Sequence, residues 1–210
     1  YTVGLEPYSL SYDKEGKLMW IALYGDNKII GVDSQGKIQA SVDTANRPNT
    51  VLWTGSQLWA TLSGDDQNVG NMVITLDSTA TITGTFSVGQ NPADLAWNDT
   101  AQIIYTADYN DGTVTALDAT GKLVGKYKVG KQPGALAWDG QHLWVSLYGD
   151  NAALALDANG FPLVEVPVTA PDGIQFDGTY VWVVSEGTKD KSGNSIIRID
   201  DQAVFKGTQQ

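Results

Sequence analysis

Four acidic side chains are the strongest candidates for chemistry, because they stand where a pattern repeated five times along the chain does not require an acid. They are Asp94, Asp108, Asp172 and Glu186. Calcium takes six to eight oxygen ligands, many of them carboxylates, and gathered acids repel one another unless a cation, a proton or solvent intervenes. These residues predict a calcium site if the fold brings them together. A pair such as Asp94 and Asp108 could instead serve acid–base catalysis.

A second candidate set could contact an organic ligand. Tyr24, Tyr109 and Tyr148 share one register of the repeat, at the end of an apolar segment, and Glu186 holds the same register in the fifth copy. These four residues are predicted to contact a ligand. The alternative is that the tyrosines only frame the turn that follows them.

Two further sets of aspartates recur so regularly that they predict structural roles. Short polar side chains of this kind accept hydrogen bonds from turn amides. The first set follows the tyrosine register: Asp26, Asp65, Asp111 and Asp150. The second set closes an apolar segment in every copy: Asp33, Asp77, Asp118, Asp157 and Asp200.

Nucleophilic and histidine-based chemistry is poorly supported. The chain has no cysteine, which excludes thiolate nucleophiles, thiolate metal sites and disulfides, and it has one histidine, His142. His142 lies in a turn expected at the end of the fold opposite the candidate residues, so a Ser-His-Asp triad is not supported. No catalytic residue is assigned, and the protein is expected not to be an enzyme.

The elements that position these side chains follow from the repeat. Prolines at 7, 48, 92, 133 and 171 are separated by 41, 44, 41 and 38 residues, and an aromatic residue follows each proline five positions later. A second aromatic residue recurs in each copy: Trp20, Trp59, Tyr105, Trp144 and Trp182. A period of about 40–45 residues with several short strands is typical of β-propeller blades.

The chain is therefore predicted to be all-β, a single five-bladed propeller domain spanning 1–210. The predicted blades are 5–44, 45–88, 89–129, 130–168 and 169–210, the last including 1–4. In the fourth, the strands are expected near 135–138, 143–147, 153–156 and 163–168. The recurring aromatics are expected between blades, and the long loops 63–71 and 186–194 at the mouth of the central channel.

The first residues predict how the ring closes. Tyr1-Thr2-Val3-Gly4 has the pattern with which outer strands end elsewhere, as in Phe86-Ser87-Val88-Gly89. We expect Tyr1–Val3 to pair with the last blade, which would hide an exposed strand edge.

The net charge of the chain disfavours some classes of binding partner. With 13 basic and 24 acidic residues the net charge is −11, which disfavours nucleic acid and anionic membranes as partners. A protein or carbohydrate ligand remains open, and we expect a monomer. Few charges and many small polar residues favour an extracytoplasmic location, whether secreted, periplasmic or on the cell surface.

The repeat resembles the YVTN-type and virginiamycin-B-lyase-like propeller repeats, which are related to NHL repeats. The matching residues are Gly130-x-x-Pro133, Trp138-Asp139-Gly140, Leu143-Trp144-Val145, Gly149-Asp150-Asn151 and Asp157. The resemblance implies the propeller fold over essentially the whole chain. It does not carry over lyase activity, because no histidine occurs in any loop that matches the lyase active site. Calcium-dependent lactonases are more distant propeller relatives.

Three functions follow as hypotheses. The first is a binding or interaction module that uses the loop-bearing face at the channel mouth. The second is a calcium-dependent, lactonase-like hydrolase with an acidic cluster at the same place. The third is a structural repeat domain, natural or designed.

Overall fold

The computed structural model describes residues 1–188 and 191–206 and shows five antiparallel sheets in chain order, four of four strands and one of three. The innermost strands are β1 (Pro7–Asp13), β5 (Pro48–Trp53), β9 (Pro92–Asn98), β13 (Pro133–Trp138) and β17 (Pro171–Phe176). The second strands are β2 (Leu18–Leu23), β6 (Leu58–Gly64), β10 (Ile103–Asp108), β14 (Leu143–Leu147) and β18 (Val181–Thr188).

The outer half of each sheet completes the blade. The third strands are β3 (Lys28–Val32), β7 (Val69–Leu76), β11 (Thr113–Asp118), β15 (Ala152–Leu156) and β19 (Lys191–Ile199). The fourth strands are β4 (Ile38–Asp43), β8 (Ile82–Ser87), β12 (Leu123–Lys128) and β16 (Pro162–Pro167). The predicted strands of the fourth repeat are confirmed, with ends that differ by at most two residues. In the fifth, the helix α1 (Asp201–Lys206) follows β19 where a fourth strand was expected. No helix in the described ranges is long and apolar enough to cross a membrane.

Each blade packs on the next through two different surfaces. We call the surface toward the following blade the forward face and the surface toward the preceding blade the rear face. Trp144 and Ala153, on the forward face of the fourth blade, pack on Ile174 and Val183, on the rear face of the fifth. The recurring aromatics Trp20, Trp59, Tyr105 and Trp144 are almost fully buried between blades, as predicted.

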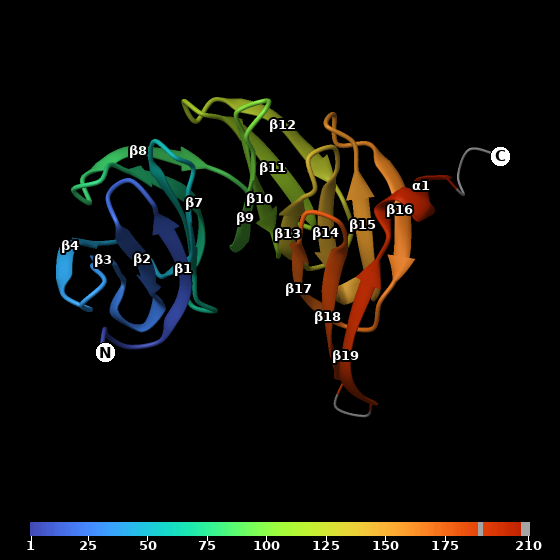
Figure 1. Cartoon of the computed structure of the whole chain (residues 1–210), viewed down its shortest axis with the longest axis horizontal. Helices are drawn as coiled ribbons and strands as arrows, with labels where there is room; N and C mark the ends of the chain where they lie inside the picture. The colour runs from blue at the N-terminus through green and yellow to red at the C-terminus, as the bar shows by residue number, and fades with distance from the viewer. Residues whose placement is uncertain (189–190, 207–210) are drawn as a thin grey trace.

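The blades form an arc rather than a closed ring in the described residues. Packing between inner strands runs from β1 to β5, β9, β13 and β17 in turn, and the first (blue) and last (red) blades end the arc in Figure 1. The three-stranded fifth sheet does not include residues 1–3, so the predicted strand pairing is not observed.

The N-terminal residues instead cover the first blade. The Tyr1 ring lies against Gly36, as Phe86 lies against Gly121 and Tyr127 against Gly160 in the next blades along. Val3 packs on the rear-face cluster of the first blade. The similarity of Tyr1–Gly4 to the end of an outer strand was therefore informative about where these residues pack, but not about what they pair with.

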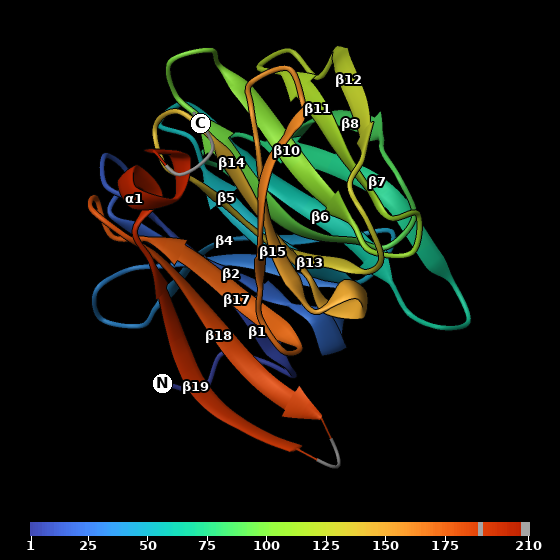
Figure 2. The same cartoon turned by 90° about the vertical axis from the view of Figure 1, so that its right-hand side faces the viewer.

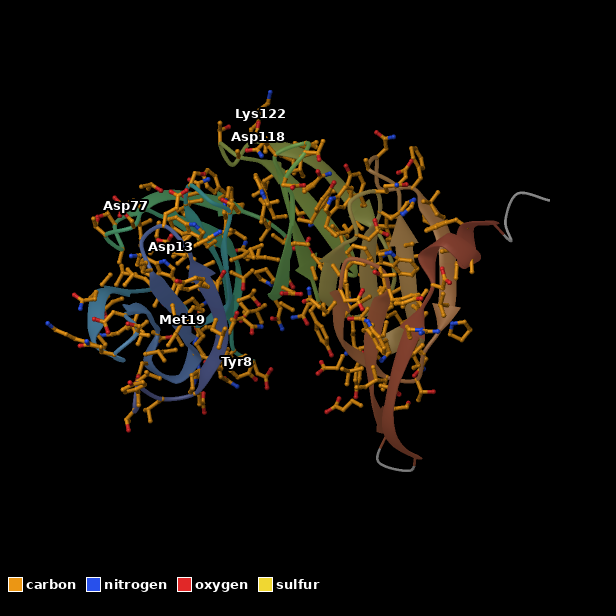
Figure 3. All side chains as sticks on the ribbon, viewed as in Figure 1. Tyr8, Asp13, Met19, Asp77, Asp118 and Lys122 are labelled. Atoms are coloured by element: carbon orange, nitrogen blue, oxygen red, sulfur yellow. The ribbon has the colours of Figure 1, made fainter. Side chains whose placement is uncertain are left out.

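The closing aspartates have the structural role predicted for them. Asp33, Asp77, Asp118 and Asp157 each accept backbone hydrogen bonds from the turn that follows the third strand. In Figure 3, Asp77 and Asp118 lie at the outer rim of their blades, far from Tyr8. Side-chain hydrogen bonds from Gln39, Thr79 and Thr120, followed by these backbone hydrogen bonds, hold the pKa of Asp33, Asp77 and Asp118 below its usual value. They therefore stabilise the fold above the unfolded pKa, near 3.9, and the stabilisation is lost as the pH falls below it.

The second blade lacks a hydrogen bond that the fourth and fifth blades make, as does the first, where the buried Nε1 of Trp20 has no partner. The indole Nε1 of Trp144 donates to Asp139 at 2.8 Å and that of Trp182 donates to Asp177 at 2.7 Å, five residues upstream in each case. At the same spacing from Trp59 the chain has Thr54, and the buried Nε1 of Trp59 has no partner.

Thr54→Asp is therefore expected to stabilise the protein by about 1 kcal/mol, because it supplies an acceptor to a buried donor. Urea unfolding measures the effect. In the Trp59→Phe background the gain should vanish. A gain that persists there would assign the stabilisation to the turn alone.

Candidate functional site

The inner strands converge on a cavity of about 390 Å³ at the channel mouth. In all five blades, the residue directly after the repeat proline lines this cavity: Tyr8, Asn49, Ala93, Gly134 and Asp172. In every inner strand the pairing register shifts directly after the proline. Such a bulge bends a strand and re-aims its side chains, and proline at a strand start removes no ladder bond. The repeat therefore brings one residue of each blade to the same mouth, four of them with a side chain and one, Gly134, without.

The turns between second and third strands supply the rest of the wall. These residues are Tyr24, Ser63, Gly64, Asp65, Asp66 and Tyr109, joined by Asn91 from the preceding connection. The two long loops predicted at this face are extensions of the β6–β7 and β18–β19 hairpins, and the second hairpin projects from the body in Figures 1 and 2. The tip at 189–190 lies outside the described residues.

Tyr24 is held firmly at the edge of the cavity. Its ring stacks on Tyr8 with centroids 4.9 Å apart, and its hydroxyl donates to the Gly64 carbonyl at 2.8 Å. The Arg47 guanidinium lies 4.9 Å from the same ring and pairs with Asp65 at 3.1 Å. Tyr24 therefore presents a fixed aromatic surface and also frames the turn, so the two sequence alternatives are not exclusive.

Three of the other predicted residues influence the Tyr109 hydroxyl electrostatically. Burial raises the pKa of the Tyr109 hydroxyl, and the neighbouring Tyr148, Asp172 and Glu186 raise it further. Tyr109 also lines a second, larger cavity of about 700 Å³ between the third and fourth blades, with Lys128, Lys131 and Asp150. Tyr109 thus lines both cavities.

Asp94 lies apart from this group and accepts a hydrogen bond across the interface between the third and fourth blades. Its carboxylate accepts the Leu136 amide of the next inner strand at 2.8 Å. The hydroxyls of Ser9 and Ser11 accept amides of the second blade in the same way. Burial raises the pKa of Asp94 to about 6.

Asp108 is also engaged. It is fully buried and accepts hydrogen bonds from the hydroxyls of Thr106, Thr113 and Thr115 at 2.6–2.8 Å. Asp94 lies opposite Ala107 in the sheet register, and successive residues of a strand face opposite sides. Asp94 and Asp108 therefore point to opposite faces of the third sheet, which does not suit the acid–base pair considered from the sequence.

The four acids predicted as calcium ligands do not form one site. No group of three or more acidic or histidine side chains suited to a metal occurs in 1–188 and 191–206. Asp172 lines the cavity together with Tyr109, and Glu186 contributes to the raised pKa of the Tyr109 hydroxyl, whereas Asp94 and Asp108 are used within the fold. The threonines around Asp108 are the sequence signal that indicates its structural role.

The recurring turn acids and His142 are structural as well. Asp26, Asp111 and Asp150 accept amides of the connection that enters the same blade. His142 lies in the turn between β13 and β14, where its ring stacks on Phe205 at 4.1 Å and Nδ1 lies 3.2 Å from Asp139.

Replacing Asp94 by asparagine tests how its burial affects stability. Because the folded pKa is raised from 3.8 to about 6, the folded state binds more protons than the unfolded state between these values, and stability falls as pH rises through this range. Asparagine keeps an acceptor for Leu136 and stays neutral. We expect Asp94→Asn to gain about 1–3 kcal/mol on the wild type between about pH 4 and pH 7. Urea unfolding at several pH values measures this gain. A constant difference between the two proteins across this range would contradict the raised pKa.

Comparison with known proteins gives the fold. No family model and no curated protein sequence matches the chain. A streptogramin B lyase structure matches with a TM-score of 0.77 and 21% identity, over 93% of this chain and 66% of that one. Virginiamycin B lyase from Staphylococcus aureus matches with a TM-score of 0.78 and 18% identity, over 93% and 67%. A catalytically inactive variant of that lyase, solved with quinupristin, matches with a TM-score of 0.75 and 20% identity, over 90% and 64%.

The chain thus spans about two thirds of the length of these lyases. At this level of identity the comparison shows that the fold is shared, and it does not show a shared activity. The five sheets and these neighbours together show that the chain has the YVTN- and NHL-like β-propeller fold of the streptogramin and virginiamycin B lyases.

Proposed function

We propose that the protein is a non-catalytic binding module whose ligand enters the channel mouth with a positively charged group. The observation that carries this proposal is the convergence of one side chain or backbone position from each of the five inner strands on a single cavity. A wall built from every blade is rigid, and function is commonly carried by loops placed on a rigid scaffold.

The chemistry of the wall favours a cation. Within the described residues the carboxylates of Asp66 and Asp172 make no hydrogen bond or ion pair, and both face the cavity. Tyr8 and Tyr109 add aromatic surface, on which ammonium and guanidinium groups bind favourably. Arg47, which lies over the ring of the wall residue Tyr24, is already paired with Asp65. A lysine or arginine side chain of a protein or peptide partner fits this combination better than an anionic group does.

The hydrolase hypothesis has weaker support, because Asp94 is engaged in a hydrogen bond between two blades and Asp108 in hydrogen bonds within the third blade. A neutral carbohydrate remains the natural comparison ligand, because tyrosine faces also accept sugars.

Calorimetric titration with a short lysine- and arginine-rich peptide, and separately with neutral oligosaccharides, tests the proposal. We expect the peptide to bind, with an affinity that falls as salt rises. Asp172→Asn and Tyr109→Ala should each weaken it about five- to tenfold, corresponding to about 1 kcal/mol or more.

Asp99→Asn is the matched control, because it removes one exposed acid in the turn between β9 and β10, away from the mouth. It should leave the affinity unchanged. Equal weakening by Asp99→Asn and Asp172→Asn would mean that the net charge of the protein, and not the mouth, attracts the peptide. Binding of an oligosaccharide with no binding of the peptide would overturn the cationic ligand.

A further inference from the structure

The cavity of about 700 Å³ between the third and fourth blades adjoins the mouth and differs from it in charge. We call it the interblade cavity. Its wall consists of 109–112 between β10 and β11, Lys128 at the end of β12, 130–132 before β13, and Gly149 and Asp150 after β14. Its volume suits a small ligand or one part of a larger ligand. Since Tyr109 also lines the mouth, a ligand on this ring can reach both cavities.

The chain concentrates basic residues beside the interblade cavity. Residues 119–138 contain four lysines and no acid, although the whole chain has 13 basic and 24 acidic residues. Two of these lysines, Lys128 and Lys131, line the cavity. No other blade has a lysine at either position. The residues in the register of Lys128 are Asp43, Ser87 and Pro167, and those two positions before the repeat proline, as Lys131 is, are Leu5, Asn46, Gln90 and Thr169.

The two acids of this cavity already have partners within the protein. Asp111 accepts the Gln90 amide at 3.2 Å and the Lys126 ammonium at 3.0 Å. The hydrogen bond from Lys126 is the main reason why the pKa of Asp111 lies below its usual value. Asp150 accepts the Lys131 amide at 2.6 Å and lies 3.8 Å from the ammonium of the same residue. Each carboxylate is thus matched by a lysine of its own.

Lys128 is the basic group that remains. Within 1–188 and 191–206 its ammonium makes no hydrogen bond or ion pair, whereas Asp94 and Asp108, which also depart from the repeat, are bonded inside the fold. The side-chain amide of Gln132 lines the same cavity and has no hydrogen-bond partner in these ranges either. An ammonium and an amide NH₂ are both donors, and a carboxylate can accept from both of them.

We propose that the ligand of the mouth is a peptide segment that carries a carboxylate close to its basic group, and that this carboxylate binds Lys128 in the interblade cavity. The inference rests on the function proposed above and defines the ligand of that site more closely. The basic group would lie at Asp172 in the mouth, the carboxylate at Lys128, and the chain between them on the Tyr109 ring. The opposite charges of the two cavities would also fix the direction in which the peptide binds, because the reversed orientation brings like charges together.

Calorimetric titration with three peptides of equal length tests the proposal. The parent peptide contains arginine and glycine and ends in an amide. In the second peptide a glutamate replaces one glycine, at a series of spacings from the arginine, and in the third a free carboxylate replaces the terminal amide. We expect at least one of the two acidic peptides to bind about five- to tenfold more tightly than the parent, as for a charge-assisted hydrogen bond. The net charge of −11 acts in the opposite sense, since it disfavours a peptide that has become less positive.

Two variants locate the gain. In Lys128→Gln the acidic peptide and the parent should bind equally, because the partner of the carboxylate is gone. Lys122→Gln is the matched control, since it removes the same charge from the turn before β12, close to Asp118 and far from Tyr8 in Figure 3. It should keep the full ratio between the two affinities.

The outcomes separate this inference from the function on which it rests. If the parent binds and neither acidic peptide binds more tightly, the site at Lys128 is wrong and the cationic mouth stands. If none of the peptides binds, both proposals fail. An acidic peptide without arginine that binds as tightly as the doubly charged one would make the interblade cavity a separate anion site and contradict the joint ligand. Equal loss of the ratio in Lys122→Gln and Lys128→Gln would assign the gain to the general charge of the third blade. A gain from glutamate alone, or from the terminal carboxylate alone, supports the proposal and identifies the source of the carboxylate.

Discussion

Trp144→Ala is expected to lower the free energy of unfolding by about 3–5 kcal/mol, whereas Trp182→Ala should lower it by about 1–2 kcal/mol. The two tryptophans hold the same register of the repeat, and both donate to an aspartate five residues upstream. They differ in burial, since Trp144 is fully enclosed between two blades and Trp182 is 36% exposed. The difference between the two losses therefore measures how much burial of this tryptophan between two blades contributes to the free energy of unfolding.

The measurement is urea unfolding followed by far-ultraviolet circular dichroism, because removing a tryptophan changes the fluorescence signal itself. Both variants should be compared at the same protein concentration. Equal losses would contradict the open arc, because they would mean that the fifth blade is covered within a single chain.

The repeat made most of the fold predictable, and the reason is physical. A blade is a local unit whose strands are joined by short turns, so the proline, the two aromatics and the closing aspartate of one copy define its pairing. The structure beyond the last copy of the repeat, and the closure of the ring, do not depend on pairing within one blade. The sequence after Asp200 forms α1 and not a fourth strand, and whether the first and last blades meet depends on the angle between all the blades in between.

The candidate site was predictable in part for a related reason. Tyr24, Tyr109, Tyr148 and Glu186 were predicted from register alone, and of these Tyr24 and Tyr109 line the cavity. Asp94 and Asp108 stood out because they depart from the repeat, which was interpreted as a sign of function. The partner of Asp94, the Leu136 amide, comes from the next blade, and the partners of Asp108 are three threonine hydroxyls on its own strand and the neighbouring one. A departure from a repeat can be compensated by neighbours that depart with it, which one register viewed alone does not reveal.

Asp108→Leu tests this compensation and is expected to destabilise the protein by about 2–4 kcal/mol, although leucine is the residue of the repeat here. Leu23, Leu62 and Leu147 hold this register in three other blades. In the third blade, leucine would leave the hydroxyls of three threonines without their acceptor, and each buried hydroxyl left unpaired costs about 1–3 kcal/mol. The added apolar burial offsets part of this loss, as does removal of a carboxyl whose pKa is raised by burial.

Two companion variants separate this explanation from simple overpacking. Asp108→Asn keeps an acceptor and should lose much less stability in the same unfolding measurement. Asp108→Leu combined with valine at positions 106, 113 and 115 replaces donors and acceptor together, which can be nearly neutral, and should recover most of the loss. If Asp108→Leu alone is as stable as the wild type, the carboxylate is dispensable for folding. An acid kept at a position that the fold does not need would then again be a candidate for chemistry. If the combined variant is no better than Asp108→Leu, the loss comes from the volume of leucine beside Gly89, whose Cα is closely approached by the Asp108 side chain.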